Sequence, residues 1–96
     1  MKPVKDIENK LKELKPFLAD KFHVRRIGYF GSYASGLQNS RSDLDLLVEF
    51  SEPVGWDFFT LEKFLEQEFE LNIDLVTQEA LKDRIRKPIL NLVKFV

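Results

Sequence analysis

The chain has no cysteine, only one histidine and one tryptophan, and a formal net charge of only −1. The absence of cysteine excludes disulfides, thiolate metal sites and cysteine nucleophiles, and it fits a reducing compartment. The near-neutral charge creates no global positive field, so we expect no direct nucleic-acid binding. No apolar run approaches the length of a membrane span, and the N-terminus lacks the apolar core of a signal peptide. These absences predict a soluble, cytoplasmic protein without a membrane segment.

The composition that remains is typical of a globular domain. Of the 96 residues, 44% are hydrophobic and 32% are charged, which is a folded rather than a disordered balance. A chain of this length fits one small domain, and it contains no internal repeat, low-complexity tract or linker. We therefore predict a single domain over residues 1–96.

The first part of the chain combines helical and extended patterns. Apolar residues recur at three- and four-residue steps from Val4 to Leu18, which predicts an amphipathic helix. Pro16 lacks an N–H group, so we expect the helix to break before it. A β-branched and aromatic run predicts a strand, and Ser32 is expected to start a short helix. The predicted elements are a helix over 3–14, a turn or short helix over 16–22, a strand over 24–30 and a short helix over 32–37.

Two further strand patterns follow, with a helical pattern between them. This order predicts a right-handed crossover that joins two parallel strands, and the first strand must then run antiparallel to its neighbour. Pro88 is expected to interrupt the C-terminal helix. The result is an α/β (α+β) fold, with a small mixed sheet and helices on one face. The predicted elements are a strand over 43–50, a helix over 56–70, a strand over 71–77 and a helix from 79 to about 86, followed by an apolar closing segment.

Three aspartates are predicted to meet at one edge of this sheet. Because side chains alternate along a strand, Asp43 and Asp45 lie on the face opposite the core residues of their strand. Parallel neighbours begin at the same edge, so we expect Asp74 beside them on the same face. Like charges this close require either a proton or a cation. Carboxylate oxygens suit Mg²⁺, so Asp43, Asp45 and Asp74 are predicted as catalytic ligands of one or two Mg²⁺ ions.

A Gly-Ser turn ends the first strand, near the point where the aspartate strand begins. Gly31 lets the backbone approach a ligand closely, and the turn offers N–H groups and the Ser32 hydroxyl to a phosphate. The alternative is a plain turn followed by a helix cap. Gly-Ser and Asp-x-Asp are each unspecific alone. The combination is much more specific: Asp-x-Asp follows Gly-Ser after a spacing of ten residues, and another aspartate lies in the next parallel strand. This combination strongly indicates nucleotidyl transfer.

Over nearly its whole length the chain resembles the minimal nucleotidyltransferases of the DNA polymerase β-like superfamily. The resemblance implies the polymerase β-like fold and Mg²⁺-dependent transfer of a nucleoside monophosphate, with ATP as the substrate. Family members are commonly antitoxins paired with a HEPN-domain toxin, and the implied acceptor is a tyrosine hydroxyl of that partner. The matching segments are the phosphate turn 30–34, the metal-binding strand 42–50, the loop 53–59, the third-carboxylate strand 73–77 and the closing segment 80–90.

The resemblance also assigns residues and exposes departures from the family. The residues that we predict to bind the phosphates are Gly31, Ser32, Arg41 and Ser42. The family often has arginine where this chain has Ser35, which removes one cation for the phosphates. Arg41 either replaces that cation or is only a loop charge. Two alternatives to adenylylation of a protein stay open: a contact antitoxin with a vestigial site, and transfer onto RNA or a small molecule.

Overall fold

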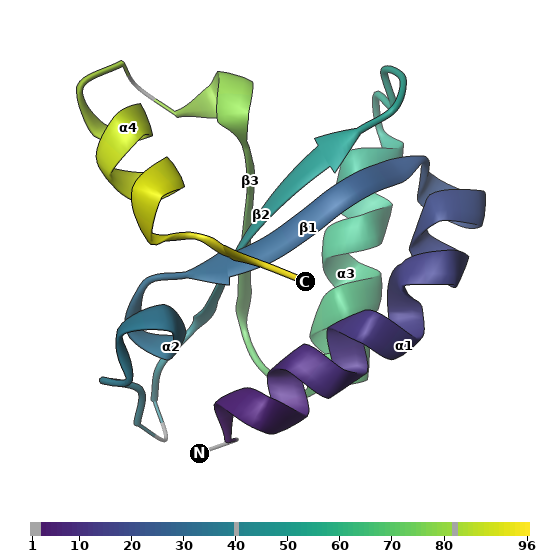
Figure 1. Cartoon of the computed structure of the whole chain (residues 1–96). Helices are drawn as coiled ribbons and strands as arrows, with labels where there is room; N and C mark the ends of the chain where they lie inside the picture. The colour runs from purple at the N-terminus through teal and green to yellow at the C-terminus, as the bar shows by residue number, and fades with distance from the viewer. Residues whose placement is uncertain (1–2, 40, 82) are drawn as a thin grey trace.

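The computed structural model describes residues 3–39, 41–81 and 83–96, apart from the side chains of residues 83–85. Its centre is a sheet of four strands in the order β3-β2-β1-β4 (Figure 1). The strands are β1 (Val24–Phe30), β2 (Leu44–Phe50), β3 (Ile73–Thr77) and β4 (Lys94–Phe95). The helices are α1 (Val4–Phe22), α2 (Ser32–Ser35), α3 (Asp57–Phe69), the 3₁₀ turn η1 (Gln78–Ala80) and α4 (Asp83–Leu92).

The strand directions agree with the prediction. β2 and β3 are parallel neighbours joined through α3, and β1 runs antiparallel to β2, so the mixed sheet is confirmed. The short β4 lies outside the predicted strands and pairs antiparallel with β1. A Cβ atom on Gly28 would lie only 2.8 Å from the Lys94 carbonyl oxygen. Glycine at this position therefore lets the C-terminal strand pair closely with β1.

The two long helices, α1 and α3, cover one face of the sheet, as predicted. Tyr29 of β1 is buried below α1 and donates its hydroxyl proton to Glu8 Oε2 at 2.8 Å. Burial, with the hydrogen bond and negative charge of Glu8, raises the pKa of Tyr29 to about 12. Within the described ranges no helix is long and apolar enough to cross a membrane. The apolar core includes Ile7, Leu11, Leu18, Phe22, Ile27, Leu44, Leu46, Val48, Leu61, Leu65, Phe69, Ile73 and Leu75.

Both helix breaks predicted at proline are wrong. Pro16 lies inside α1, which bends but continues as one helix (Figure 1), and Pro88 lies inside α4. A proline removes one backbone hydrogen bond and kinks the helix, but it does not end a helix whose two halves are both packed. In α1 the buried residues stand on both sides of the proline and form one apolar stripe: Ile7, Leu11, Leu18 and Phe22.

Three element boundaries also differ from the predicted ones. α2 stops at Ser35 because Gly36 adopts a left-handed conformation with φ 78°, which ends a helix. β2 begins at Leu44 and β3 at Ile73, both later than the alternation of side chains predicts. Asp43 therefore lies just outside the strand that was expected to carry it.

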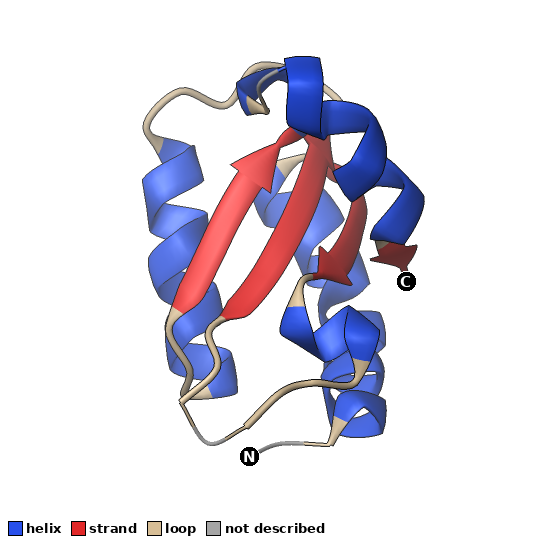
Figure 2. Cartoon of the chain, turned by 90° about the vertical axis from the view of Figure 1, so that its left-hand side faces the viewer, coloured by secondary structure: helices blue, strands red, loops and turns tan. Residues whose placement is uncertain are grey.

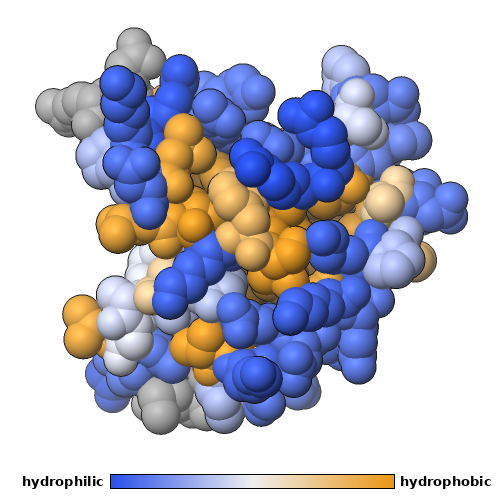
Figure 3. All heavy atoms as spheres, in the orientation of Figure 1, coloured by the Kyte–Doolittle hydropathy of each residue, from blue (hydrophilic) through white to orange (hydrophobic). Residues whose placement is uncertain are grey.

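The second face of the sheet is only partly covered. Figure 2 looks onto this face, where β3 and β2 lie open between α4 above and α2 below. Figure 3 shows apolar side chains gathered over α4 and the C-terminal strand, next to polar ones on either side. Leu47 of β2 is fully buried on this face, whereas the neighbouring Leu46 and Val48 belong to the core below the long helices. Near the start of the two parallel strands, Asp74 of β3 is exposed and Asp45 of β2 is half-buried.

Candidate active site

Asp45 of β2 and Asp74 of β3 stand directly opposite each other in the parallel pair of strands. The register is set where both strands begin, by a 2.9 Å hydrogen bond from the Leu44 N–H to the Asn72 carbonyl oxygen. The residues flanking each aspartate within its strand are largely buried, and the negative charge of Asp74 acts on the Asp45 carboxyl group. The predicted meeting of these two aspartates is confirmed.

The Asp45 carboxyl group holds a proton more readily than an ordinary aspartate, because it is half-buried beside other negative charges. Burial, the negative charges of Asp74 and Asp43, and the hydrogen bond with Asp74 raise the pKa of Asp45 from 3.8 to about 6. Asp74, in the edge strand, is exposed. At neutral pH the pair therefore carries excess negative charge, which a bound cation relieves.

Asp43 lies one position before β2, with an exposed side chain. Its charge acts on Asp45, but among the described residues no three His, Cys, Asp or Glu side chains are grouped so that they could hold a metal ion as they stand. An Mg²⁺ ion that also binds phosphate needs only one or two protein carboxylates, because phosphate oxygens and water complete its shell. Asp45 and Asp74 meet this requirement, so their oxygen-only donor set fits Mg²⁺.

Gly31 lies against the aspartate pair from the β1 side. Its φ of 70° and ψ of −145° are essentially restricted to glycine. A Cβ atom here would overlap Asp45 Oδ2 and lie 3.1 Å from Asp45 Cγ. Ser32 begins α2 directly afterwards, and no side chain caps this helix, so its first N–H groups have no acceptor within the helix. The predicted Gly-Ser turn thus lies beside the aspartates.

Arg41 and Ser42 line a cavity of about 430 Å³ that Gly31 and Ser32 do not line. The Ser42 hydroxyl accepts a 2.9 Å hydrogen bond from the Asn39 N–H and stabilises the loop before β2. Carboxylates outnumber the single guanidinium around this cavity. The structure therefore does not gather the four predicted phosphate-binding residues in one cavity. The remaining lining residues are Asp43, Glu66, Glu70, Leu71 and Asn72.

Gly31 lines another cavity of about 430 Å³, between α2 and the segment that joins α4 to β4. Most of its wall is apolar, and its polar side chains are Ser35, Asn91 and Lys94. The sequence pattern gives no role to Asn91 or Lys94, because both belong to a segment interpreted only as apolar. The only feature of the sequence that could have drawn attention to Lys94 is its position as a lysine between apolar residues near the C-terminus.

A family model described as the nucleotidyltransferase domain matches residues 11–96. The chain belongs to this family. The matched range includes the Gly31 turn and the strands that carry Asp45 and Asp74. The resemblance inferred from the sequence is therefore confirmed, and the protein is a nucleotidyltransferase.

Related proteins and solved structures agree with this membership. The protein adenylyltransferase MntA of Thermococcus cleftensis is 41% identical over 97 aligned positions, covering 100% of this nucleotidyltransferase and 98% of that protein. The structure of a candidate minimal nucleotidyltransferase has a TM-score of 0.83 and 28% identity, covering 97% of this chain and 95% of the other. A toxin–antitoxin crystal structure with AMP-PNP has a TM-score of 0.74 and 26% identity, covering 92% and 70%. The nucleotidyltransferase fold is thereby confirmed.

Proposed function

We propose that this nucleotidyltransferase moves AMP from ATP onto a hydroxyl group of a protein partner, and that it acts in the cytoplasm as the antitoxin of a HEPN-domain toxin. The observation that carries the proposal is the directly opposed pair Asp45–Asp74 beside the turn at Gly31. This arrangement offers two carboxylates to a cation and backbone N–H groups to a phosphate. In the proposal, residues 1–96 act as one minimal domain.

The aspartates are proposed to hold Mg²⁺, as one ion or two. Asp45 and Asp74 are the central ligands, and Asp43 adds its carboxylate from the loop before β2. Bound Mg²⁺ would neutralise phosphate charge and stabilise the attacking and leaving oxygens. Asp45 would hold the ion in its deprotonated form, since a ligating carboxylate carries no proton. Asp74, exposed in the edge strand, would either hold the ion that activates the acceptor hydroxyl or take up the hydroxyl proton.

In the proposed reaction the acceptor oxygen attacks the α-phosphorus of ATP and forms a new P–O bond. The bond from the α-phosphorus to the oxygen that bridges it to the β-phosphate breaks, and pyrophosphate leaves with that electron pair. The hydroxyl proton passes to Asp74 or to water. Gly31 and Ser32 are proposed to bind phosphate through backbone N–H groups and the serine hydroxyl. Arg41 and Ser42 are proposed as further phosphate contacts from the loop before β2.

Two observations support a protein as the acceptor. The relative from Thermococcus cleftensis is named a protein adenylyltransferase, and the similar structure with AMP-PNP is a toxin–antitoxin structure. The Asp74 side chain is exposed, and no helix lies over β2 and β3 in the interval between α2 and α4 (Figure 2). The near-neutral net charge disfavours RNA as the acceptor.

Incubation with ATP, Mg²⁺ and the HEPN-domain protein encoded beside this chain is expected to add the mass of AMP to that partner. Intact-protein mass spectrometry measures the gain, and peptide mapping is expected to place it on a tyrosine. Asp74→Asn removes a cation ligand and is expected to slow the gain by about 100-fold or more. Asp20→Asn, on the exposed side of α1, is the matched control and should leave the rate unchanged. No gain with folded wild-type protein and folded partner would contradict the proposal.

The second candidate is an antitoxin that neutralises its partner by contact alone. One observation favours it, namely that the described aspartates form no three-ligand metal group as they stand. The double variant Asp43→Asn/Asp45→Asn separates the two candidates in cells that express the partner. Loss of protection supports transfer, whereas full protection by this variant supports contact.

A further inference from the structure

We propose that Lys94 binds the β- and γ-phosphates of the nucleotide, in the cavity between α2 and the α4–β4 segment. This role rests on the proposed function, because it assigns the phosphate tail of that substrate to a particular cation. It concerns a residue of β4, outside the predicted phosphate-binding set.

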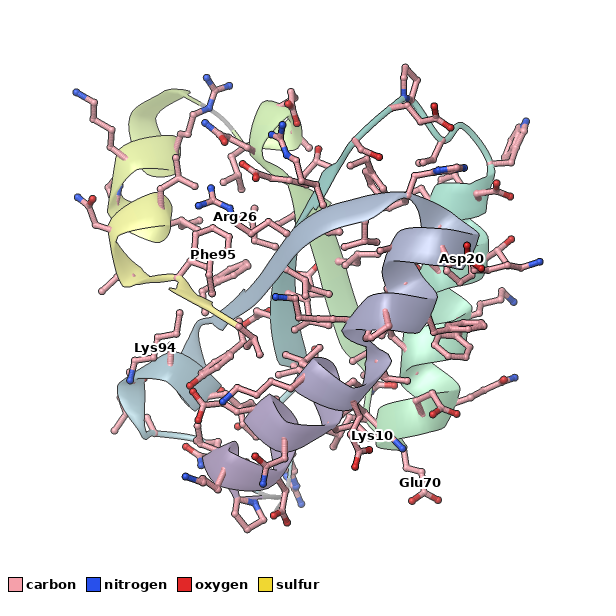
Figure 4. The ribbon with its side chains drawn as sticks, turned by 45° about the vertical axis from the view of Figure 1, so that its right-hand side comes forward. Lys10, Asp20, Arg26, Glu70, Lys94 and Phe95 are labelled. Carbon is pink, nitrogen blue, oxygen red and sulfur yellow. The ribbon has the colours of Figure 1, made fainter. Side chains whose placement is uncertain are left out.

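The placement of Lys94 follows from the pairing of β4 with β1. Lys94 stands opposite Tyr29, two positions before the turn at Gly31. β4 is held there by Phe95, whose ring lies 3.7 Å from the Arg26 guanidinium carbon. Figure 4 shows Lys94 extending from β4 toward α2, and the same cavity is lined by Gly31 and Ser35. The amine thus belongs to the wall of the cavity that begins at the phosphate turn.

The charge of Lys94 is uncompensated within the part of the chain that the structure describes. Its side chain is exposed and takes part in no ion pair or hydrogen bond there. Lys10 and Lys15 are engaged, with Glu68 at 3.3 Å and with the Val96 carbonyl oxygen at 2.7 Å, whereas exposed lysines such as Lys12 have no partner among the described residues either. Lys94 differs from Lys12 because it lines a cavity, so its ammonium is available there for an anionic ligand.

Charge also decides which cavity receives the phosphate tail. Transfer requires the α-phosphate at Asp45 and Asp74, and two cavities adjoin these residues, one lined by Asp43 and the other by Gly31. The cavity with Arg41 is also lined by Asp43, Glu66 and Glu70, so its surroundings repel additional negative charge. Among the residues that the structure describes, none that lines the cavity with Lys94 carries a carboxylate. Gly31 both touches Asp45 and lines this second cavity, so it connects the reacting centre with Lys94.

Titration calorimetry with Mg²⁺ and either ATP or AMP tests this role without the partner protein. Lys94→Ala and Lys94→Gln are each expected to weaken ATP binding by about tenfold, because a charge-assisted contact is lost. Neither should change AMP binding, since AMP lacks the two outer phosphates. Lys94→Arg is expected to retain ATP affinity. Lys12→Ala, which removes an exposed lysine of α1, is the matched control and should behave as wild type.

Unchanged ATP affinity in both Lys94→Ala and Lys94→Gln would overturn the role, as would an equal loss for ATP and AMP. Circular dichroism tests whether each variant is folded. If Lys94→Ala does not fold, Lys94→Gln still tests the role, because glutamine keeps most of the apolar stem of the lysine. Wild-type protein that binds ATP but modifies no partner would overturn the proposed function and leave the role of Lys94 standing. Wild-type protein that binds no ATP would overturn both.

Discussion

Replacing Gly31 by alanine is expected to reduce nucleotidyl transfer by about 100-fold or more, since displacing reacting groups by about 1 Å already has an effect of that size. The added Cβ would overlap Asp45 Oδ2, so the carboxylate must leave its position opposite Asp74. The backbone conformation of Gly31 is also essentially closed to alanine. The initial rate of AMP incorporation into the partner measures the loss.

Gly36→Ala provides a matched control for the strain of this substitution. Gly36 also has a positive φ, 78°, but nothing lies within 4 Å of the Cβ that alanine would add. We expect Gly36→Ala to lower the free energy of unfolding by about 1 kcal/mol and to retain most of the activity. Equal activity losses in the two variants would show that backbone strain, rather than the contact with Asp45, explains the effect of Gly31→Ala.

Asp45→Asn is expected to make the metal-free protein more stable at pH 8 while removing its activity. The pKa of Asp45 in the folded protein is about 6, above the ordinary value of 3.8. Protonation of Asp45 therefore favours the folded state. Its contribution to the free energy of unfolding is complete below about pH 4 and is lost as the pH rises through about 6. An asparagine amide at position 45 can donate a hydrogen bond to the Asp74 carboxylate, and it removes the repulsion between the two charges. We expect a gain of about 1–2 kcal/mol at pH 8, reduced for solvent screening.

Urea unfolding in EDTA at pH 4.5 and pH 8 measures this difference. The gain from Asp45→Asn should be small at pH 4.5 and larger at pH 8, and Asp20→Asn should show no comparable change. Added Mg²⁺ should stabilise the wild type and have much less effect on Asp45→Asn, because binding to the folded state alone raises stability. If Asp45→Asn is less stable than wild type at pH 8, repulsion between Asp45 and Asp74 does not destabilise the folded protein.

Much of the site could be predicted because two simple regularities act together. Alternation along β2 places Asp45 opposite the core residues, and a parallel neighbour must begin at the same edge of the sheet. Asp74 follows from these two rules alone. The turn at Gly31 was also predictable, since a glycine between a strand and a helix indicates a conformation or a close approach that other residues do not allow.

The other features depend on contacts between distant segments. β4 has only two residues and no strand pattern of its own, and its position depends on the absence of a side chain at Gly28. Lys94 therefore lacked a predictable location. Pro16 breaks a helix by local preference, but packing of both halves of α1 on the sheet outweighs that preference. Asp43 was misplaced because alternation says nothing about a residue just outside the strand.

The most direct test of the central claim is the position of Mn²⁺ in crystals of this protein grown with Mn²⁺ and AMP-PNP. Anomalous scattering locates the ion without reference to the protein coordinates. We predict a peak about 2 Å from carboxylate oxygens of both Asp45 and Asp74, with phosphate oxygens of the nucleotide beside Gly31. A bound nucleotide whose metal ion contacts neither aspartate would contradict the claim that this pair forms the catalytic centre.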